Sequence, residues 1–247
     1  MIESSVFEPM IKYASLDEND TVLDIGAGLG FLTRFMAKKC KSVLAVEADP
    51  ELAGILREQL ADSPNVTVIE GNVFKVNLSP FNKVVSVPPY GISSHLLLWL
   101  FNKGFDNAVL VFQKEFADRL MASAGSENYG WLTVLTYYYA QAQLLNSVPK
   151  TMFYPQPKID SIVTRLESRN PRPFTLNNET SFKQLVQLLF TERNKKIRNA
   201  VLPYIKVMTG TSKKKAAEIA DKLPFRDKRA RELAPEDFGV LVDALGT

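Results

Sequence analysis

The sequence is poor in side chains that bind metals or carry redox chemistry. Its 247 residues include one cysteine, Cys40, and one histidine, His95. One cysteine excludes an internal disulfide, and these two residues do not supply the ligands of a tetrahedral zinc site, so we predict no metal. Serine hydrolysis would depend on His95 alone, and no nucleophile-elbow pattern accompanies it.

Long apolar runs are also missing from the sequence. No stretch reaches the roughly 18 residues of a membrane-spanning helix, so we expect no membrane association. The first residues, MIESSVFEPMIKYA, contain no hydrophobic signal core, which predicts a cytoplasmic protein. A hydrophobic content of 46% supports a sizeable core, and the length suits one large domain or one domain with a small appendage.

Charge is unevenly distributed along the chain. Residues 171–247 carry 15 Lys and Arg against 9 Asp and Glu, whereas residues 1–170 carry 15 against 18. The basic last third indicates contact with a polyanion. A solvated helical face rich in Lys and Arg has the same composition, so charge alone leaves both interpretations open.

Short β-rich runs alternate with helical stretches over the first 115 residues. The runs are almost continuously apolar, which is typical of parallel strands buried on both faces. This alternation predicts an α/β fold with a doubly wound, Rossmann-like sheet, whose ligands bind beyond the carboxyl ends of the strands. The predicted strands are Thr21–Ile25, Val43–Glu47, Val66–Glu70, Lys83–Val87 and Ala108–Gln113, and the predicted helices are Phe31–Lys39, Glu51–Leu60 and Ser93–Lys103.

The rest of the chain predicts further strands and then a helical region. Trp131–Ala140 fits either a helix or a strand, because its apolar residues are nearly continuous. Other predicted elements are a helix over Lys114–Ala122, strands over Gln141–Val148 and Ser161–Glu167, a linker over Arg169–Phe174, and helices over Ser181–Tyr204, Ser212–Asp221 and Pro235–Leu245. We therefore predict two domains, residues 1–170 and a small helical domain, residues 171–247.

A glycine-rich turn joins the first predicted strand to the first helix. The sequence DIGAGLG, residues 24–30, places glycines at 26, 28 and 30, where they allow positive φ and close approach of a ligand. Gly-x-Gly-x-Gly differs from the dinucleotide fingerprint and is typical of enzymes that bind S-adenosylmethionine. Glu47 ends the second strand and is placed to accept hydrogen bonds from ribose hydroxyls. The predicted cofactor residues here are Asp24, Gly26, Gly28, Gly30 and Glu47; plain nucleotide folds also use such turns.

Two residues after the third strand complete the predicted cofactor site. Many methyltransferases have an Asp at this position, where it contacts the adenine amine of the cofactor. This chain has Asn72, followed by Val73. The Asn72 side-chain oxygen can still accept a hydrogen bond, although the residue would also suit an ordinary turn.

The segment VVSVPPYGISS, residues 84–94, contains a Pro-Pro-Tyr turn after the fourth strand. Enzymes that methylate the exocyclic amine of adenine carry such a turn, usually preceded by Asn or Asp. An aromatic ring there can stack on a base that has left its helix. In this chain the preceding residue is Val87, which has no side-chain acceptor.

Seven blocks together resemble the ribosomal RNA adenine dimethyltransferase family, which methylates two adjacent adenines near the 3′ end of small-subunit RNA. The similarity extends from about Val6 to about Ala200, and the last three blocks separate this family from other amino-methyltransferases. The blocks are DIGAGLG (24–30), VEADP (46–50), PPYGISS (88–94), VFQKEFADRL (111–120), ENYGWLTV (127–134), FYPQPKIDS (153–161) and LLFTERNKKIRNAV (188–201).

The resemblance implies roles for individual residues. Tyr90 corresponds to the aromatic beside the target adenine and Phe153 to a second aromatic wall, although both would also suit ordinary core packing. The carbonyl of Pro88 would accept one hydrogen of the amine. Four cations would contact the RNA backbone, where contacts add salt-sensitive affinity without sequence information; they are Arg193, Lys195, Lys196 and Arg198.

Three features depart from the family pattern. The family's Gly-Gln-(His/Asn)-Phe-Leu segment has no counterpart in this sequence, Asn72 replaces an acid, and Val87 replaces an amide. Ser86 is a poor substitute for the amide because it lies on the opposite face of the strand. Losing one aligned acceptor costs on the order of 3 kcal/mol, or roughly 10²-fold in rate, so we expect weakened transfer.

Three functional hypotheses follow. The first is S-adenosylmethionine-dependent N6,N6-dimethylation of adenines in small-subunit ribosomal RNA, acting as a monomer on the immature small subunit. The second is a catalytically weakened or inactive RNA-binding ribosome-assembly factor on the same scaffold, motivated by Val87 and Asn72. The third, methylation of another RNA or a small molecule, has less support because the C-terminal blocks still match ribosomal RNA binders.

Overall fold

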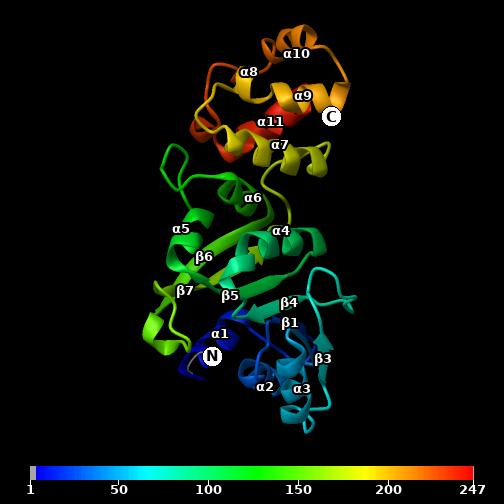
Figure 1. Cartoon of the computed structure of the whole chain (residues 1–247), viewed down its shortest axis with the longest axis vertical. Helices are drawn as coiled ribbons and strands as arrows, with labels where there is room; N and C mark the ends of the chain where they lie inside the picture. The colour runs from blue at the N-terminus through cyan, green and yellow to red at the C-terminus, as the bar shows by residue number, and fades with distance from the viewer. Residues whose placement is uncertain (1–3, 247) are drawn as a thin grey trace. The chain divides into compact units, whose positions relative to one another are not determined.

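The structure is a computed structural model that describes Ser4–Gly246 (Figure 1). This described part of the chain forms two compact units. The first unit runs to Ala117 and resumes over Gln141–Ser168; the second contains Asp118–Ala140 and the chain from Arg169 onward. Asp118–Ala140, which the sequence analysis placed in the first domain, groups with the second unit because the helix within it packs against two helices near the C-terminus.

The first unit is built on a mixed sheet, which within the described residues has seven strands in the order β3-β2-β1-β4-β5-β7-β6. Neighbours from β3 to β5 pair in parallel, and β7 runs antiparallel to β5. The doubly wound Rossmann-like α/β class is confirmed. The strands are β1 (Thr21–Ile25), β2 (Ser42–Glu47), β3 (Val66–Glu70), β4 (Lys83–Ser86), β5 (Asn107–Gln113), β6 (Ala140–Val148) and β7 (Ser161–Ser168).

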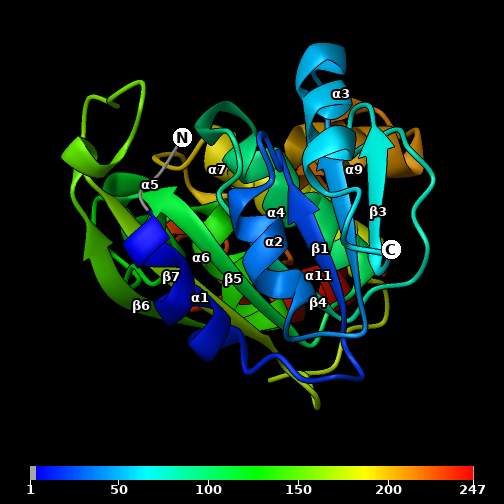
Figure 2. The same cartoon turned by 90° about the horizontal axis from the view of Figure 1, so that it is seen from below.

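Helices cover both faces of this sheet. Figure 2 shows α1 and α2 over one face, beside β5 and β1, where apolar side chains such as Phe7, Met10 and Met36 pack on Val22, Val85 and Val109. Figure 1 shows α4 on the other side of β4 and β5. The helices are α1 (Phe7–Ala14), α2 (Phe31–Ala37), α3 (Pro50–Gln59), α4 (Ser93–Lys103) and α5 (Lys114–Leu120). The sequence analysis predicted all of them except α1.

The second unit is helical. The ambiguous segment 131–140 forms a helix over Trp131–Tyr139, and the segment predicted as a linker is fixed to it, because the Arg172 guanidinium donates to the Tyr139 carbonyl over 2.9 Å. The helices are α6 (Trp131–Tyr139), α7 (Glu179–Thr191), α8 (Ile197–Ala200), α9 (Leu202–Thr209), α10 (Lys213–Ala220) and α11 (Pro235–Leu245). Within Ser4–Gly246 no helix is long and apolar enough to cross a bilayer.

The prediction of one continuous helix over Ser181–Tyr204 is wrong. The helix α7 ends at Thr191, and α8 begins at Ile197. Between them Lys196 has extended backbone and forms an antiparallel bridge with Arg229, while the Ile197 N–H donates to the Lys228 carbonyl over 2.8 Å. A contact with a distant segment therefore takes the backbone bonds that a continuous helix would use.

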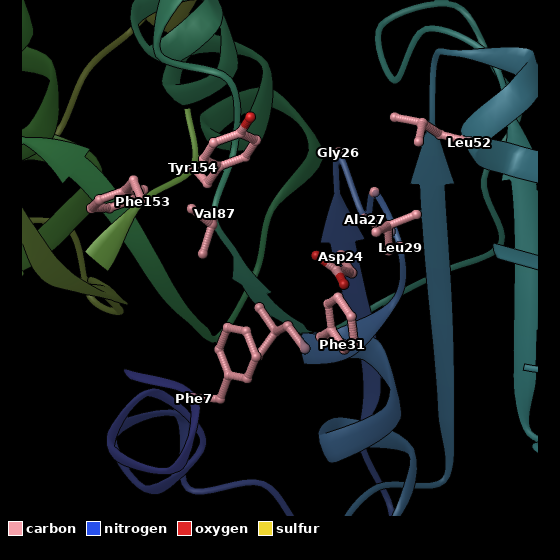
Figure 3. A pocket seen from close by; sticks show the side chains of 12 residues that line it. Phe7, Asp24, Gly26, Ala27, Leu29, Phe31, Leu52, Val87, Phe153 and Tyr154 are labelled. Atoms are coloured by element: carbon pink, nitrogen blue, oxygen red, sulfur yellow. The ribbon is translucent and has the colours of Figure 1, made fainter. Parts of the chain in front are cut away.

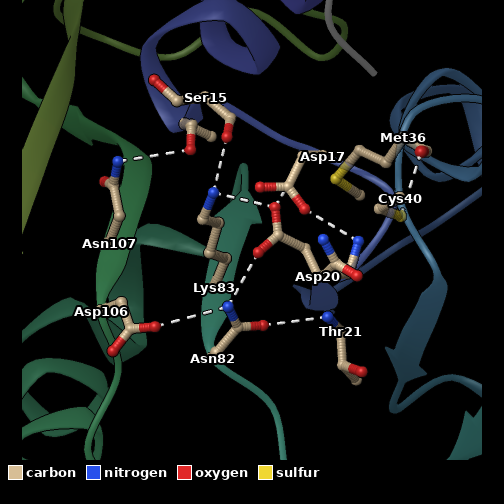
Figure 4. A network of polar contacts seen from close by, with 12 residues as sticks. Ser15, Asp17, Asp20, Thr21, Met36, Cys40, Asn82, Lys83, Asp106 and Asn107 are labelled. Atoms are coloured by element: carbon tan, nitrogen blue, oxygen red, sulfur yellow. Dashed lines mark hydrogen bonds and ion pairs between the residues drawn. The ribbon is translucent and has the colours of Figure 1, made fainter.

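A polar network joins β1 and β4 where the two strands begin (Figure 4). The buried Asp20 carboxylate accepts from Lys83 Nζ over 2.8 Å, from Asn82 over 2.8 Å and from the Asp17 N–H over 2.7 Å. Lys83 also donates to the Ser15 carbonyl over 2.6 Å. Burial acts to raise the pKa of Asp20, but the bonds from Lys83, Asp17 and Asn82 outweigh it and lower that pKa overall.

Asp20→Asn should destabilise the protein by about 3 kcal/mol at neutral pH, because it leaves the buried Lys83 ammonium without its counter-charge. The pKa of Asp20 is lower in the folded protein, so its contribution is present above the unfolded pKa of about 3.9 and is lost as pH falls through the folded value. Urea unfolding at several pH values should therefore show the difference between the two proteins shrinking below about pH 4.

The exposed Arg57–Glu70 pair, with an N–O distance of 3.0 Å, provides the control. Arg57→Met should cost less than about 1 kcal/mol. If Asp20→Asn and Arg57→Met lower the free energy of unfolding equally, the buried network does not stabilise the protein more than an exposed ion pair does.

Candidate functional site

The glycine turn folds over the carboxyl end of β2. Gly26, Gly28 and Gly30 have φ of 71°, 56° and 79°, which is the left-handed region that glycine adopts without a steric penalty. The N–H groups of Gly26 and Ala27 both donate to the Val46 carbonyl, over 2.8 and 3.1 Å. The turn is thereby fixed to the neighbouring strand.

The three glycines have different surroundings. A Cβ on Gly26 would lie 3.0 Å from Pro89, and one on Gly30 would lie 2.5 Å from Leu56, whereas one on Gly28 would meet no atom within 4 Å. Gly26 and Gly30 are therefore needed for packing. Gly28 leaves the backbone open to a ligand.

Glu47 organises the turn from the end of β2. Its side chain is only 8% exposed; Oε2 accepts from the Gly28 N–H over 2.8 Å and Oε1 from the Asp49 N–H over 3.0 Å. A carboxylate has about four lone-pair sites. Glu47 can therefore hold the turn and still accept hydrogen bonds from two hydroxyl groups of a ligand.

Asp24 is a buried acid near the end of β1. Thr33 donates to its carboxylate over 2.6 Å. Burial raises the pKa of Asp24 to about 7, with the hydrogen bond from Thr33 opposing the rise and the Glu47 charge adding to it. A positively charged ligand beside Asp24 would favour its ionised form.

Strands β1 and β4 part at the site. They pair as far as Leu23 and Val84. Beyond that point the buried Ser86 hydroxyl accepts from the Ile25 N–H over 3.1 Å and donates to the Ile25 carbonyl over 2.6 Å. Because its hydroxyl is occupied in this way, Ser86 does not replace the missing acceptor at Val87. The chain reverses its strand order between β1 and β4, and crevices at such points bind ligands.

A cavity of about 310 Å³ opens at this crevice (Figure 3), within the range of small-molecule sites. Figure 3 shows Val87 and Phe153 on one side of it and Leu29 and Leu52 on the other. Five predicted site residues line it: Asp24, Gly26, Gly28, Val87 and Phe153. Six other predicted residues lie outside this lining: Gly30, Glu47, Asn72, Val73, Pro88 and Tyr90.

Seven residues of the lining were not predicted. Most are apolar side chains of the glycine turn and of the helices beside it, and they are Phe7, Ala27, Leu29, Phe31, Leu32, Leu52 and Tyr154. Phe31, directly after the turn, is 46% exposed although it is a large apolar residue. An aromatic at the end of a ligand-binding turn is a signal that sequence reasoning could have used. Phe7 carried no such signal, because only the packing of α1 brings it here.

Tyr90 and Phe153 lie together, as the sequence analysis expected of two aromatic walls. Their ring centroids are 6.2 Å apart in an edge-to-face arrangement. The Tyr90 hydroxyl is 2.6 Å from Ser161 Oγ on β7, and burial raises the pKa of this tyrosine. Both rings therefore have fixed positions, which suits stacking on a planar ligand.

The turn after β3 uses Asn72 in its own structure. Its Oδ1 accepts from the Phe74 N–H over 2.9 Å, and Val73 is buried. The Gly71 N–H donates to the Glu47 carbonyl over 2.7 Å, so this turn adjoins the end of β2. Asn72 is exposed, and its role toward a cofactor stays a prediction.

The four predicted RNA-binding cations lie in the second unit in three different environments. Arg193 donates to the carbonyls of Glu127 and Ser126, over 3.0 and 3.4 Å. Lys195 pairs with Glu192 over 3.0 Å. Asp227 lies 3.2 Å from Lys196, 3.3 Å from Arg198 and 3.4 Å from Arg226, which the sequence analysis did not single out. Among the described residues no cluster of His, Cys, Asp and Glu is arranged to hold a metal ion.

Known proteins are similar to this chain over nearly its full length. The family model described as ribosomal RNA adenine dimethylase matches residues 1–236. A protein of Methanosarcina mazei named probable ribosomal RNA small subunit methyltransferase A is 38% identical, over 99% of this chain and 90% of its own length. A protein of the same name from Thermococcus kodakarensis is 39% identical, over 96% of this chain and 84% of its own length.

Solved structures are also similar to this chain over nearly its full length. A dimethyladenosine transferase from Plasmodium falciparum superposes with a TM-score of 0.81 at 25% identity, covering 98% of this chain and 95% of that one. The 23S rRNA methyltransferase ErmE superposes with a TM-score of 0.69 at 25% identity, covering 99% and 98%. The similarity in both cases includes the sheet and the helical second unit, because nearly the whole chain is covered.

Gly28→Ala should weaken the binding of S-adenosylmethionine by about tenfold or more, equivalent to about 1.4 kcal/mol, because the added methyl group enters the open side of the turn. Gly104→Ala is the matched control. Gly104 also has positive φ, 81°, and open space around its Cβ position, but it lies outside the cavity. Calorimetric titration should show the weaker binding only for Gly28→Ala; equal weakening in both variants would mean that backbone strain, not contact with the ligand, is responsible.

Proposed function

This chain belongs to the ribosomal RNA adenine dimethylase family, and we propose that it transfers methyl groups from S-adenosylmethionine to the N6 amines of two adjacent adenines near the 3′ end of small-subunit ribosomal RNA. One observation carries the proposal. The glycine turn and the Pro-Pro-Tyr turn meet at the same crevice, where Gly26 has no room for a side chain beside Pro89. The two turns, which would hold different ligands, thus adjoin at one cavity, which Gly26, Gly28 and Val87 line.

Residues of the cavity, and Glu47 next to it, fit the methyl donor. Gly28 leaves an open approach, Glu47 has free lone pairs for ribose hydroxyls, and Asp24 offers a negative charge near a sulfonium. When bound, S-adenosylmethionine supplies an electrophilic methyl group. The apolar side chains around the cavity, among them Leu29 and Leu52, exclude water and hold the donor in one orientation.

The opposite side of the cavity suits an adenine. Phe153 lines the cavity, and Tyr90, which lies outside the lining, meets the Phe153 ring edge to face; together they would provide fixed aromatic surfaces on which a base removed from its helix can stack. The family resemblance assigns the amine to the Pro88 carbonyl. The neighbouring Pro89 carbonyl already accepts from the Ile92 N–H over 3.1 Å. An acceptor on an amine hydrogen makes the nitrogen lone pair more available for attack.

Val87 limits this chemistry. Its side chain lines the cavity and packs against the same apolar cluster as Phe153. Valine cannot accept a hydrogen bond, so one of the two acceptors expected for the amine is missing. This observation favours a second candidate, an RNA-binding ribosome-assembly factor with weak or no transferase activity.

Val87→Asn should raise the rate of methyl transfer by roughly 10²-fold, because it restores an acceptor for the amine. The assay would follow labelled methyl groups from S-adenosylmethionine into small-subunit particles that lack the two dimethyladenines. Val87→Ala is the control, since it shortens the side chain without adding an acceptor, and it should not accelerate transfer.

The outcomes separate the two candidates. Transfer by the unaltered chain, accelerated in Val87→Asn alone, supports the enzyme with a weakened site. If Val87→Asn is no faster than Val87→Ala, the role assigned to this position is wrong. If no variant transfers methyl groups although each binds the donor and the particle, the assembly factor becomes the better description; loss of all cellular function in Glu47→Ala would count against that factor.

The second unit would hold the RNA backbone. Lys196, Arg198 and Arg226 surround Asp227, whose pKa is lowered first of all by the bond from Lys196 and further by the other two cations. One carboxylate thus gathers three cations at one exposed place. Such a cluster binds phosphate oxygens without reading sequence.

We also propose, from the family and the composition, that the substrate is the immature small subunit. The protein would act on it as a monomer in the cytoplasm.

Asp227→Asn should strengthen RNA binding about threefold, because it removes a negative charge that would repel the phosphates bound by the neighbouring cations. The salt dependence of binding should become steeper. Glu218→Gln, an equal change of charge at an exposed position on α10, is the control. Weaker binding in Asp227→Asn would show that the carboxylate is needed to arrange the cations.

A further inference from the structure

Three of the seven sequence blocks that carry the family resemblance converge on one cleft of the second unit. The cleft has a volume of about 360 Å³. VFQKEFADRL contributes Arg119, ENYGWLTV contributes residues 127–132, and LLFTERNKKIRNAV contributes Phe190 and Arg193. The donor cavity uses none of these residues, and only Arg193 had a predicted role.

Hydrogen bonds fix the walls of this cleft. Thr133 Oγ1 donates to the Arg119 carbonyl over 2.6 Å and accepts from the Gly130 N–H over 3.1 Å, so it joins the end of α5 to the start of α6. The buried Tyr129 donates to the Leu233 carbonyl over 2.8 Å, and its ring meets Phe190 edge to face at 5.6 Å. The cleft is therefore formed before a ligand arrives.

The lining combines aromatic surface with positive charge. Trp131 and Phe190 are each half-buried. Arg193 is held by the carbonyls of Glu127 and Ser126, which use two of the five N–H donors of a guanidinium. Arg119 is exposed and adds a second guanidinium, against one carboxylate in the lining, that of Glu127.

We infer that this cleft binds one nucleotide of the RNA substrate, with its base against Trp131 or Phe190 and its phosphate on Arg119 and Arg193. Bases stack on aromatic side chains irrespective of sequence, and guanidinium groups bind phosphate oxygens in a forked geometry. Asn128 in the lining can donate to and accept from a base edge. The inference rests on the proposed function for the identity of the ligand as RNA.

The chain offers a direct spectroscopic test, because it has two tryptophans, Trp99 and Trp131. In full-length protein carrying Trp99→Phe, Trp131 is the one remaining indole. A single-stranded hexa-adenylate should quench its fluorescence. Adding Arg119→Ala or Arg193→Gln should weaken the binding seen by quenching at least about fivefold, and the removal of one cation from a phosphate should lower the salt slope by roughly 0.7.

Trp131→Ala should also lower the affinity at least about fivefold, because it removes a ring on which a base can stack. A labelled hexa-adenylate would measure this loss, which would confirm stacking. Lys214→Ala, at an exposed position on α10, is the control for general surface charge. Arg119→Lys keeps the charge and guards against misfolding, and circular dichroism would check the fold of each variant.

The results distinguish this inference from the proposed function. Quenching of Trp131 fluorescence does not require methyl transfer. Quenching without transfer would therefore support nucleotide binding in the cleft and contradict the proposed methyltransferase activity. The opposite outcome is methyl transfer without quenching, and with unchanged affinity in Trp131→Ala and Arg119→Ala. It would overturn nucleotide binding in the cleft and leave the proposed activity intact. An effect of Lys214→Ala as large as that of Arg119→Ala would reduce the cleft to ordinary surface charge and would also overturn the inference.

Discussion

The separation of β1 from β4 is the constraint on which the site depends. Parallel strands normally continue their ladder to the end of the sheet, but here the Ser86 hydroxyl takes over at Ile25, through two hydrogen bonds to its backbone. This single side chain fixes how far apart the two strand ends lie. The glycine turn leaves one strand end and the Pro-Pro-Tyr turn leaves the other, so the bonds of one buried side chain lie between the two turns.

Val87 shows how closely packing and chemistry are connected at such a crevice. It follows Ser86 directly, and the alternation of a strand puts it on the other face, toward the cavity and the apolar cluster of α1. A valine there gains dispersion contacts with this cluster, against which Phe153 also packs. Valine has no polar group, so the side-chain acceptor that the proposed reaction would use at this position is absent.

Several cationic side chains of the second unit are held in place by hydrogen bonds and ion pairs. Arg193 is fixed by backbone carbonyls and the cluster around Asp227 by a shared carboxylate. A cation whose side chain is already ordered loses less entropy when it meets a phosphate. Four cations of residues 171–247 thus lie in two places of different chemistry: Arg193 in a cleft with aromatic walls, and Lys196, Arg198 and Arg226 in an exposed cluster.

Local rules were sufficient for much of the fold and part of the site. The spacing of glycines 26, 28 and 30 determined three left-handed positions, because only glycine accepts that backbone without a penalty. Continuous apolar runs determined the parallel strands, because only strands buried on both faces are apolar throughout. Glu47 could be proposed for the site from its place at the end of the second strand, whereas Tyr90 and Phe153 were assigned through the resemblance to a family.

Tertiary structure decided what depends on distant partners. The bridge of Lys196 to Arg229 broke a helix that the local sequence favours, and the packing of α6 on α7 and α11 assigned residues 118–140 to the second unit. Phe7 lines the cavity at the glycine turn, and Arg119 and Arg193 line one cleft, only because elements far apart in sequence pack together. Such contacts have no period or spacing in the sequence, since each exists only once two folded surfaces meet.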